Sequence, residues 1–360
     1  MPSVDQVRID WSHLVQLSSQ HLVTPELARA IDEQRSLRVP ASVTDYLKSI
    51  RRLNAKRNAS AIDESLSIVR EMNREGIRPL LLKGAGNLLT GVYPELASRV
   101  MTDIDMIVAP EEHPAARRVL ELHGYVQSVG PYREEVDHHH GPPRVHASRR
   151  FRVELHRLAL TRRCCALVPC EEAMATAWPV ERDGIAFRVM SPTLRMIHLV
   201  AHCQLQNGHH AARVVELRNL VDAQYYVARF QEQLDWAKVA QRFEAAGAGA
   251  ALDGFRLLAR SLLGVRLGDD APAALTAQWA RFATGVHLGH PRLNAVVMRA
   301  RLLSRLGRLP ARLADPSWYG RKWRFMQLER DAGRRVLYGR RAEIYHRRST
   351  DGKTEIAPDD

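Results

Sequence analysis

The chain has 360 residues, of which 45% are hydrophobic and 26% charged, as in an ordinary globular protein. A chain of this length buries a sizeable core and is expected to form more than one domain. No stretch approaches the roughly 18 uncharged apolar residues of a membrane-spanning helix, and we expect no secretory signal because the first residues carry acids and no apolar region.

The net charge of +13 is concentrated near the C-terminus. Residues 292–348 contain sixteen Lys or Arg residues and four acids, a net charge of +12, so the rest of the chain is close to balanced. Only six of the 53 basic residues are lysines, which draws attention to Lys83. The four cysteines lack paired CxxC spacing and are expected to be free thiols, which favours a cytoplasmic location.

The predicted elements begin with helices. Residues 1–75 have apolar residues at helical spacing, and the last of these helices is expected to end at Gly76. The short apolar run IRPLLLKG then predicts a strand, and AGNLLTGVYPELA predicts a short helix broken at Pro94. The segment RVMTDIDMIV predicts a second strand that Pro110 ends, and EEHPAARRVLELHGY predicts an amphipathic helix up to Gly124.

Three further segments, GYVQSV, YREEVDHHH and RRFRVELHRLAL, are strand candidates, and from about Ser191 the pattern is helical. We therefore predict an α+β protein with a mixed β-sheet core. The expected domains are a helical N-terminal region (1–75), the core (76–190), an α-helical C-terminal domain (191–312) and a basic, aromatic-containing tail (313–360).

The strand that contains Asp103 and Asp105 carries the first chemical signal. Side chains alternate along a strand, so the two acids share one face and lie about 7 Å apart, whereas Ile104 and Met106 face the core. A bound divalent cation relieves the repulsion between such acids. On the later strand Arg152, Glu154 and His156 share a face, and Glu154 becomes a third acid at the same point if the two strands are neighbours. The alternative is a solvated face of an edge strand.

A set of motifs lies along the chain: Lys83-Gly84, Arg99, Asp103-Ile104-Asp105, Gly124-Tyr125 and Glu154-Leu155-His156, and in the C-terminal half His202, the stretch Leu217–Asp222 and LDWAKV. Together they resemble a known family, the uncharacterised nucleotidyltransferases, a bacterial branch of the polymerase-β-like superfamily. It covers roughly residues 40–265, with the first forty residues and the basic C-terminal segment outside it.

The resemblance implies a nucleotidyltransferase-like mixed sheet and a Mg²⁺-dependent reaction, with Mn²⁺ as the alternative ion and an NTP as substrate. Asp103, Asp105 and Glu154 would be the catalytic metal ligands, because two-metal chemistry requires oxygen ligands around the attacking and leaving oxygens. The superfamily commonly carries Gly-Gly or Gly-Ser after the first strand, where this chain has Lys83-Gly84-Ala85-Gly86.

Four residues are candidates for nucleotide binding. Gly84 and Gly86 would let phosphate approach the backbone at the helix start, and Lys83 would add a point charge. A surface lysine in an ordinary glycine-containing turn is the alternative. Arg99 would either bind phosphate or pair with one of the acids.

Several histidines also invite interpretation. Asp137-His138-His139-His140 is similar to a metal-binding tract, but the neighbouring Gly-Pro-Pro favours a polar loop or strand end. His198 and His202 share a helical face and, with Asp222, raise the possibility of a second metal site. We prefer His202, Arg218 and Asp222 as a polar cluster that, with His156, lines a cleft, or His202 and Asp222 as a hydrogen-bonded pair between two helices.

The segment 292–348 interleaves arginines with aromatic residues, a composition that suits phosphate contact and base stacking and so makes RNA a candidate partner. An amphipathic helix on anionic lipid and a solvated arginine-rich helix are the alternatives.

The expected function is transfer of a nucleoside monophosphate from an NTP to a hydroxyl or phosphate of an acceptor that the sequence does not identify: RNA, a small molecule, a peptide or a protein. A phosphotransferase on the same core is one alternative. A non-catalytic protein that binds RNA or another partner through the basic C-terminal segment is the other.

Overall fold

The fold is described from a computed structural model, in which residues 9–34, 36–128, 139–212 and 214–268 are described together with residues 278, 282 and 285. All of them belong to the first of two compact units, Met1–Pro291. The predicted basic segment 292–348 and the tail 313–360 lie outside the described residues. No helix of the described part is long and apolar enough to cross a membrane.

A mixed seven-stranded sheet forms the centre of the fold, in the order β3-β4-β5-β2-β1-β7-β6. Two pairs, β1 with β7 and β2 with β5, are parallel, and the other neighbours are antiparallel. The strands are β1 (Leu80–Leu81), β2 (Asp103–Ile107), β3 (Val126–Gln127), β4 (Arg144–Val145), β5 (Arg152–His156), β6 (Trp178–Arg182) and β7 (Ile185–Val189). This arrangement confirms the predicted α+β fold class.

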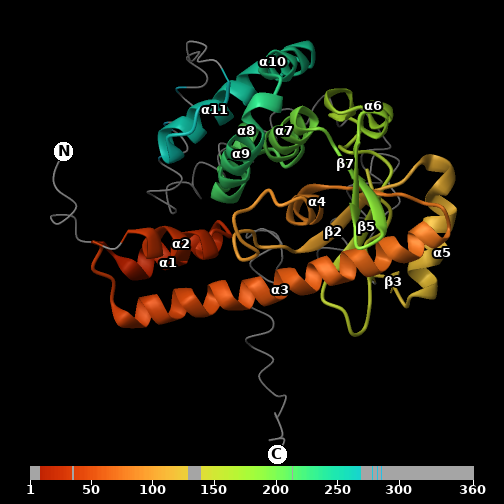
Figure 1. Ribbon diagram of the computed structural model, residues 1–360. Helices are drawn as coiled ribbons and strands as arrows, with labels where there is room; N and C mark the ends of the chain where they lie inside the picture. The colour runs from red at the N-terminus through yellow and green to blue at the C-terminus, as the bar shows by residue number, and fades with distance from the viewer. Residues whose placement is uncertain are drawn as a thin grey trace, which may run out of the picture. The chain divides into compact units, whose positions relative to one another are not determined.

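The helices before and between the strands are α1 (Trp11–Gln20), α2 (Thr24–Glu33), α3 (Ala41–Arg74), α4 (Lys83–Leu89), α5 (His113–Leu122) and α6 (Cys170–Ala175). The longest, α3, runs along the sheet and packs on α2, α4, α5 and β7 (Figure 1). Its apolar side chains, among them Leu47, Val69 and Met72, are buried at helical spacing. The predicted end at Gly76 is confirmed, because α3 stops at Arg74 and Gly76 has a φ of +76°.

After the sheet the described residues up to 268 are mainly helical, as predicted from Ser191 onward. The helices are α7 (Pro192–Val200), α8 (His209–Ala212), α9 (Leu217–Phe230), α10 (Trp236–Ala245) and α11 (Gly249–Leu263). Between α7 and α8 lies the π-helical segment η4 (Ala201–Gln206). Helices α7, α9, α10 and α11 pack on one another as a group (Figure 1).

The core is continuous from the sheet into these helices. Ile104 and Met106 of β2 and Val153 of β5 are fully buried, as the predicted alternation requires. Phe230 of α9 and Phe243 of α10 belong to the same cluster. The central strands are therefore held on their apolar face, and their polar face is free to build a site. The four cysteines are free thiols, as predicted.

Short 3₁₀ turns also occur in the described part of the chain, at η2 (Pro110–Glu112), η3 (Cys165–Leu167) and η5 (Gln231–Gln233). Of the strand candidate YREEVDHHH, only His139 and His140 are described, and His140 forms an isolated antiparallel bridge with His156. The remainder of that candidate lies outside the described residues.

Candidate functional site

The two acid-bearing strands are neighbours, which was the condition for a shared site. In the parallel pair β2–β5, Asp105 lies opposite Glu154 and Asp103 lies opposite Arg152. Directly opposed residues on one sheet face have Cβ atoms about 5 Å apart. The structure therefore brings Glu154 beside Asp105, on the face away from the core residues Ile104 and Val153.

Asp105 is the most contacted of the acids and is only 2% exposed. Its Oδ1 accepts hydrogen bonds from Lys83 Nζ at 2.9 Å and from His156 Nε2 at 2.8 Å. Burial opposes ionisation, but Lys83 and His156 outweigh it and hold the pKa of Asp105 well below its ordinary value. Asp105 is therefore a carboxylate at neutral pH.

Asp103 has a different environment on the same strand. Burial, and then repulsion by Asp105, raise the pKa of Asp103. Glu154 is also largely buried, yet the neighbouring His156, whose Nε2 lies 3.7 Å from Glu154 Oε2, helps to lower the pKa of Glu154 below the ordinary value. A cation placed among these carboxylates would relieve the repulsion around Asp103.

Lys83 has a backbone conformation that a non-glycine residue rarely adopts. Its φ is +46°, in the left-handed region, at the first residue of α4. Such strain costs on the order of 1 kcal/mol and persists where the surroundings impose it. Here the partly buried ammonium donates a hydrogen bond to Asp105. Burial lowers the pKa of Lys83, but attraction by Asp105, Asp103 and Glu154 exceeds that effect and raises it.

Gly84 and Gly86, predicted to receive phosphate, are both buried inside α4. A Cβ added to Gly84 would meet Met101 Sδ at 2.1 Å, and one added to Gly86 would meet the Leu81 carbonyl oxygen at 2.7 Å. Close packing of α4 on its neighbours therefore explains both glycines without a ligand.

The donor set fits a divalent metal ion. Ligand atoms of Asp105, Glu154 and His156 all lie within 4.8 Å of one another. Carboxylate oxygens suit Mg²⁺ and Mn²⁺, and an imidazole nitrogen suits the transition metal better. The Nδ1 atom of His156 is buried without a hydrogen-bond partner among the described residues, so the ring is oriented through Nε2 alone.

Two histidines of the His-His-His tract, for which metal binding was weighed but a polar loop or strand end was favoured, also face this site. The ring centroids of His139 and His140 lie 4.9 and 5.1 Å from that of His156. His140 Nε2 is 3.5 Å from Glu154 Oε2, while its Nδ1 contacts the Gly141 carbonyl. Burial, aided by His156, lowers the pKa of His139 to about 2, so this ring is neutral. The signal that pointed here was the His-His-His tract itself.

His202 lies at the start of the π-helical segment η4, and π-helical turns are frequent at functional sites. Its ring stacks on that of His198 at a centroid distance of 5.8 Å. Burial, followed by the charge of Lys83, lowers the pKa of His202 well below its ordinary value. The charges of Lys83 and Asp105 therefore both act on the pKa of His202.

Arg99 lies elsewhere, in a buried polar network with α9. Its Nε is 3.0 Å from Asp222 Oδ1, and the Tyr93 hydroxyl donates to the same oxygen at 3.0 Å. Asn87 of α4 donates to the hydroxyls of Tyr93 and Tyr226 at 3.1 and 2.8 Å. Of the two roles weighed for Arg99, the structure shows an ion pair, but with Asp222 rather than with Asp103 or Asp105.

The predicted cluster of His202, Arg218 and Asp222 is thus only partly assembled. Arg218 Nη2 pairs with Glu216 Oε1 at 2.9 Å, and the charge of Arg218 acts on Asp222. Among the described residues, the contacts of Asp222 are with Arg99 and Tyr93, not with His202. This network joins α4 and the segment that follows it to α9.

A comparison with curated protein sequences finds no match. A family model described as "uncharacterised nucleotidyltransferase" matches residues 8–264. The match begins at residue 8 rather than near residue 40, so the prediction that the first forty residues lie outside the family was wrong, and α1 and α2 fall inside it. With most of the chain matched and the acids of β2 and β5 on one face, the protein belongs to the family of uncharacterised nucleotidyltransferases.

Proposed function

We propose that the protein transfers a nucleoside monophosphate from an NTP to a hydroxyl or phosphate oxygen of an acceptor, with a divalent metal ion. The observation that carries this proposal is the convergence of Asp105, Glu154 and Lys83 at one point of the sheet. Buried carboxylates of this kind are arranged for cation binding, and the family is one of nucleotidyltransferases.

In the proposed reaction the acceptor oxygen attacks the α-phosphorus, a new P–O bond forms, and the bond to the bridging oxygen breaks with release of pyrophosphate. Asp103, Asp105 and Glu154 would hold the metal, and the His156 imidazole would become a further ligand once its Nε2 gives up the proton that it donates to Asp105. When bound, the metal supplies positive charge that stabilises the attacking and leaving oxygens. Mg²⁺ is the expected ion and Mn²⁺ the alternative.

The chain's own residues supply position and charge. His156 and Lys83 fix the carboxylate of Asp105 from two sides, so that its orientation is set before substrate arrives. In this proposal the Lys83 ammonium, which lies beside the metal-binding carboxylates, also interacts with the phosphate oxygens of the NTP. Nucleotidyl transfer depends mainly on such positioning and charge neutralisation, so few other catalytic groups are required.

The test is transfer of label from [α-³²P]NTPs to acceptors in a cell lysate, with Mg²⁺ or Mn²⁺ added. We expect Asp105→Asn and Glu154→Gln to reduce labelling by on the order of 100-fold or more, as for loss of a transition-state stabilising group. The matched control is Asp183→Asn, because Asp183 is 78% exposed in the β6–β7 turn and asparagine tolerates its positive φ. Equal labelling by wild type and Asp105→Asn would contradict the proposal.

A label on the γ-phosphate, run in parallel, separates this reaction from phosphoryl transfer. Sorting the labelled products into RNA, protein and small molecules then identifies the class of acceptor.

A further inference from the structure

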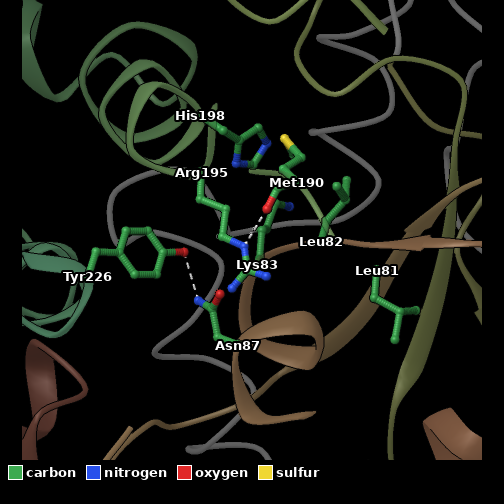
Figure 2. A pocket seen from close by; sticks show the side chains of 8 residues that line it. All are labelled: Leu81, Leu82, Lys83, Asn87, Met190, Arg195, His198 and Tyr226. Atoms are coloured by element: carbon green, nitrogen blue, oxygen red, sulfur yellow. Dashed lines mark hydrogen bonds between the residues drawn. The ribbon is translucent and has the colours of Figure 1, made fainter. Parts of the chain in front are cut away.

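A small cavity lies between α4 and the helices that follow the sheet (Figure 2). Lys83 and Asn87 reach it from α4, Arg195 and His198 from α7, and Tyr226 from α9. Leu81 of β1, the following Leu82 and Met190 complete its wall. No carboxylate lines the cavity, although two cations do.

Arg195 is the unusual member of this group. It is only 6% exposed, and Arg144 and Arg218, the other arginines buried beyond nine-tenths among the described residues, each pair with a glutamate. Arg195 has no ion pair with an acid in the described part of the chain. Its guanidinium keeps its charge inside proteins, and a buried charge without a counter-charge is strongly unfavourable.

The known contacts of Arg195 use only part of its donor capacity. Nε donates to the Met190 carbonyl at 2.8 Å and Nη1 donates to Thr90 Oγ1 at 3.1 Å, while the guanidinium lies 5.5 Å from the Phe230 ring centroid. These contacts fix the guanidinium plane and leave further N–H groups on Nη1 and Nη2. Figure 2 shows this end of Arg195 beside Lys83 and Asn87.

The neighbouring polar groups are also suited to donate. The Tyr226 hydroxyl accepts the Asn87 amide at 2.8 Å, which leaves its own proton for another acceptor. His198 is occupied through Nε2 by the Ala159 carbonyl, and burial lowers its pKa to about 3, so it adds no charge. Arg195, which has no acid partner among the described residues, and the Tyr226 hydroxyl therefore favour an anionic oxygen in this small space, while the ammonium of Lys83 is shared with Asp105.

The cavity adjoins the candidate active site through Lys83, whose Nζ lies 2.9 Å from Asp105 Oδ1. An anion that enters the cavity is therefore next to the metal-binding face of the sheet. The cavity is only large enough for a water-sized group, so it suits a single terminal oxygen of a longer anion better than a complete free ion.

We propose that this cavity is a phosphoryl subsite, in which Arg195, with Lys83 and Tyr226, binds an oxygen of a substrate phosphate group. Arg195 thus takes the phosphate-binding role that the sequence suggested for Arg99, whose charge is neutralised by Asp222. The inference rests on the proposed function for the identity of the substrate. The phosphate belongs either to the tail of the NTP or to a phosphorylated acceptor.

The test is direct binding, measured by calorimetry on the full chain with three probes: tripolyphosphate, ATP and a 5′-phosphorylated oligonucleotide. Each is titrated with and without Mg²⁺. We expect Arg195→Met to reduce the binding affinity for at least one of the three probes by about tenfold or more, which corresponds to the loss of one charge-assisted hydrogen bond. If the variant loses affinity for tripolyphosphate and ATP, the cavity binds the phosphate tail of the NTP. If it loses affinity for the oligonucleotide alone, the cavity binds a phosphate of the acceptor.

The matched control is Arg229→Met. The Arg229 guanidinium lies 5.6 Å from the same Phe230 ring, but the residue is exposed, so its removal should leave all three affinities unchanged. If Arg195→Met fails to fold, Arg195→Lys retains the charge with fewer donors and is expected to lose affinity for the same probe. Ligand-induced rise of the melting temperature gives a second readout in both variants.

Unchanged affinities for all three probes in a folded Arg195 variant would overturn the inference, even if nucleotidyl transfer is observed. Conversely, loss of tripolyphosphate binding in that variant supports the subsite even if wild type transfers no nucleotide. The two proposals therefore fail separately.

Discussion

Lys83 Nζ lies 2.9 Å from Asp105 Oδ1, although the two residues are 22 positions apart and come from different elements. The contact joins the acid strand to the start of α4, where Lys83 has a left-handed backbone. It places a cation at the centre of the three acids.

The backbone strain at Lys83 can be separated from the role of its ammonium. Lys83→Ala removes the ammonium and keeps the strain, whereas Lys83→Gly removes both. We therefore expect Lys83→Gly to be more stable than Lys83→Ala by about 1 kcal/mol, measured as the free energy of unfolding in urea. Both variants should lose labelling activity equally. A less stable glycine variant would show that the φ of +46° is not a strained conformation here.

The imidazole beside the carboxylates predicts a preference among metal ions. We expect Mn²⁺ to bind more tightly than Mg²⁺, because nitrogen ligands favour the transition metal. His156→Gln keeps a donor for Asp105 but removes the imidazole, so Mn²⁺ affinity should fall by about tenfold or more, with little change for Mg²⁺. Electron paramagnetic resonance of free Mn²⁺, with Mg²⁺ as competitor, measures both.

His123→Gln is the control for this series, since the His123 side chain is 40% exposed and pairs with Glu71. Equal losses for the two ions in His156→Gln would argue for a hydrogen-bonding role of His156 alone.

The glycines of α4 give a packing prediction. A Cβ at residue 86 would lie 2.7 Å from the Leu81 carbonyl oxygen, and a backbone atom cannot move aside cheaply. Gly86→Ala should therefore lower the free energy of unfolding by about 1–3 kcal/mol, as overpacking does. Gly249→Ala, where the nearest atom is 3.9 Å away, should change it by no more than about 0.5 kcal/mol. Thermal and urea unfolding provide the comparison.

A pH-dependent contribution to stability is expected from Glu64. Burial raises its pKa above the ordinary value of 4.5, despite the hydrogen bond that the Tyr125 hydroxyl donates at 2.6 Å. Above pH 4.5 the unfolded chain has released this proton while the folded chain still holds it, so stability falls as pH rises through that window. Glu64→Gln should remove this fall, which is measured as the difference in unfolding free energy between variant and wild type at several pH values.

Glu121 provides the opposite case. The hydrogen bond from Arg117 lowers the pKa of Glu121. The contribution of Glu121 to folding stability is therefore present above the ordinary pKa and is lost as pH falls. Glu121→Gln should therefore change the pH dependence of the unfolding free energy in the direction opposite to that of Glu64→Gln. The same sign in both variants would contradict the assignment for Glu64.

The sequence by itself determined the local part of this site. Alternation along a strand requires Asp103 and Asp105 to share a face and Ile104 and Met106 to be buried, whatever the rest of the fold does. The same rule placed Glu154 and His156 together on their strand. The helix end at Gly76 was also predictable, because glycine there adopts a positive φ at low cost.

Only the tertiary structure decided which of these local faces meet. The pairing of β2 with β5 brings Glu154 beside Asp105, and a chain crossover of this kind has no signature in either strand. The partners of the charged residues were likewise undetermined: Arg99 pairs with Asp222, 123 residues away along the chain, and Arg195 with no acid among the described residues. The sequence gives the charge of each side chain, but the partner that neutralises this charge and the burial of the side chain depend on packing between distant segments. That is why the acids were found from the pattern, while Arg195 was recognised only in the folded chain and the place of His139 and His140 beside His156 was decided there.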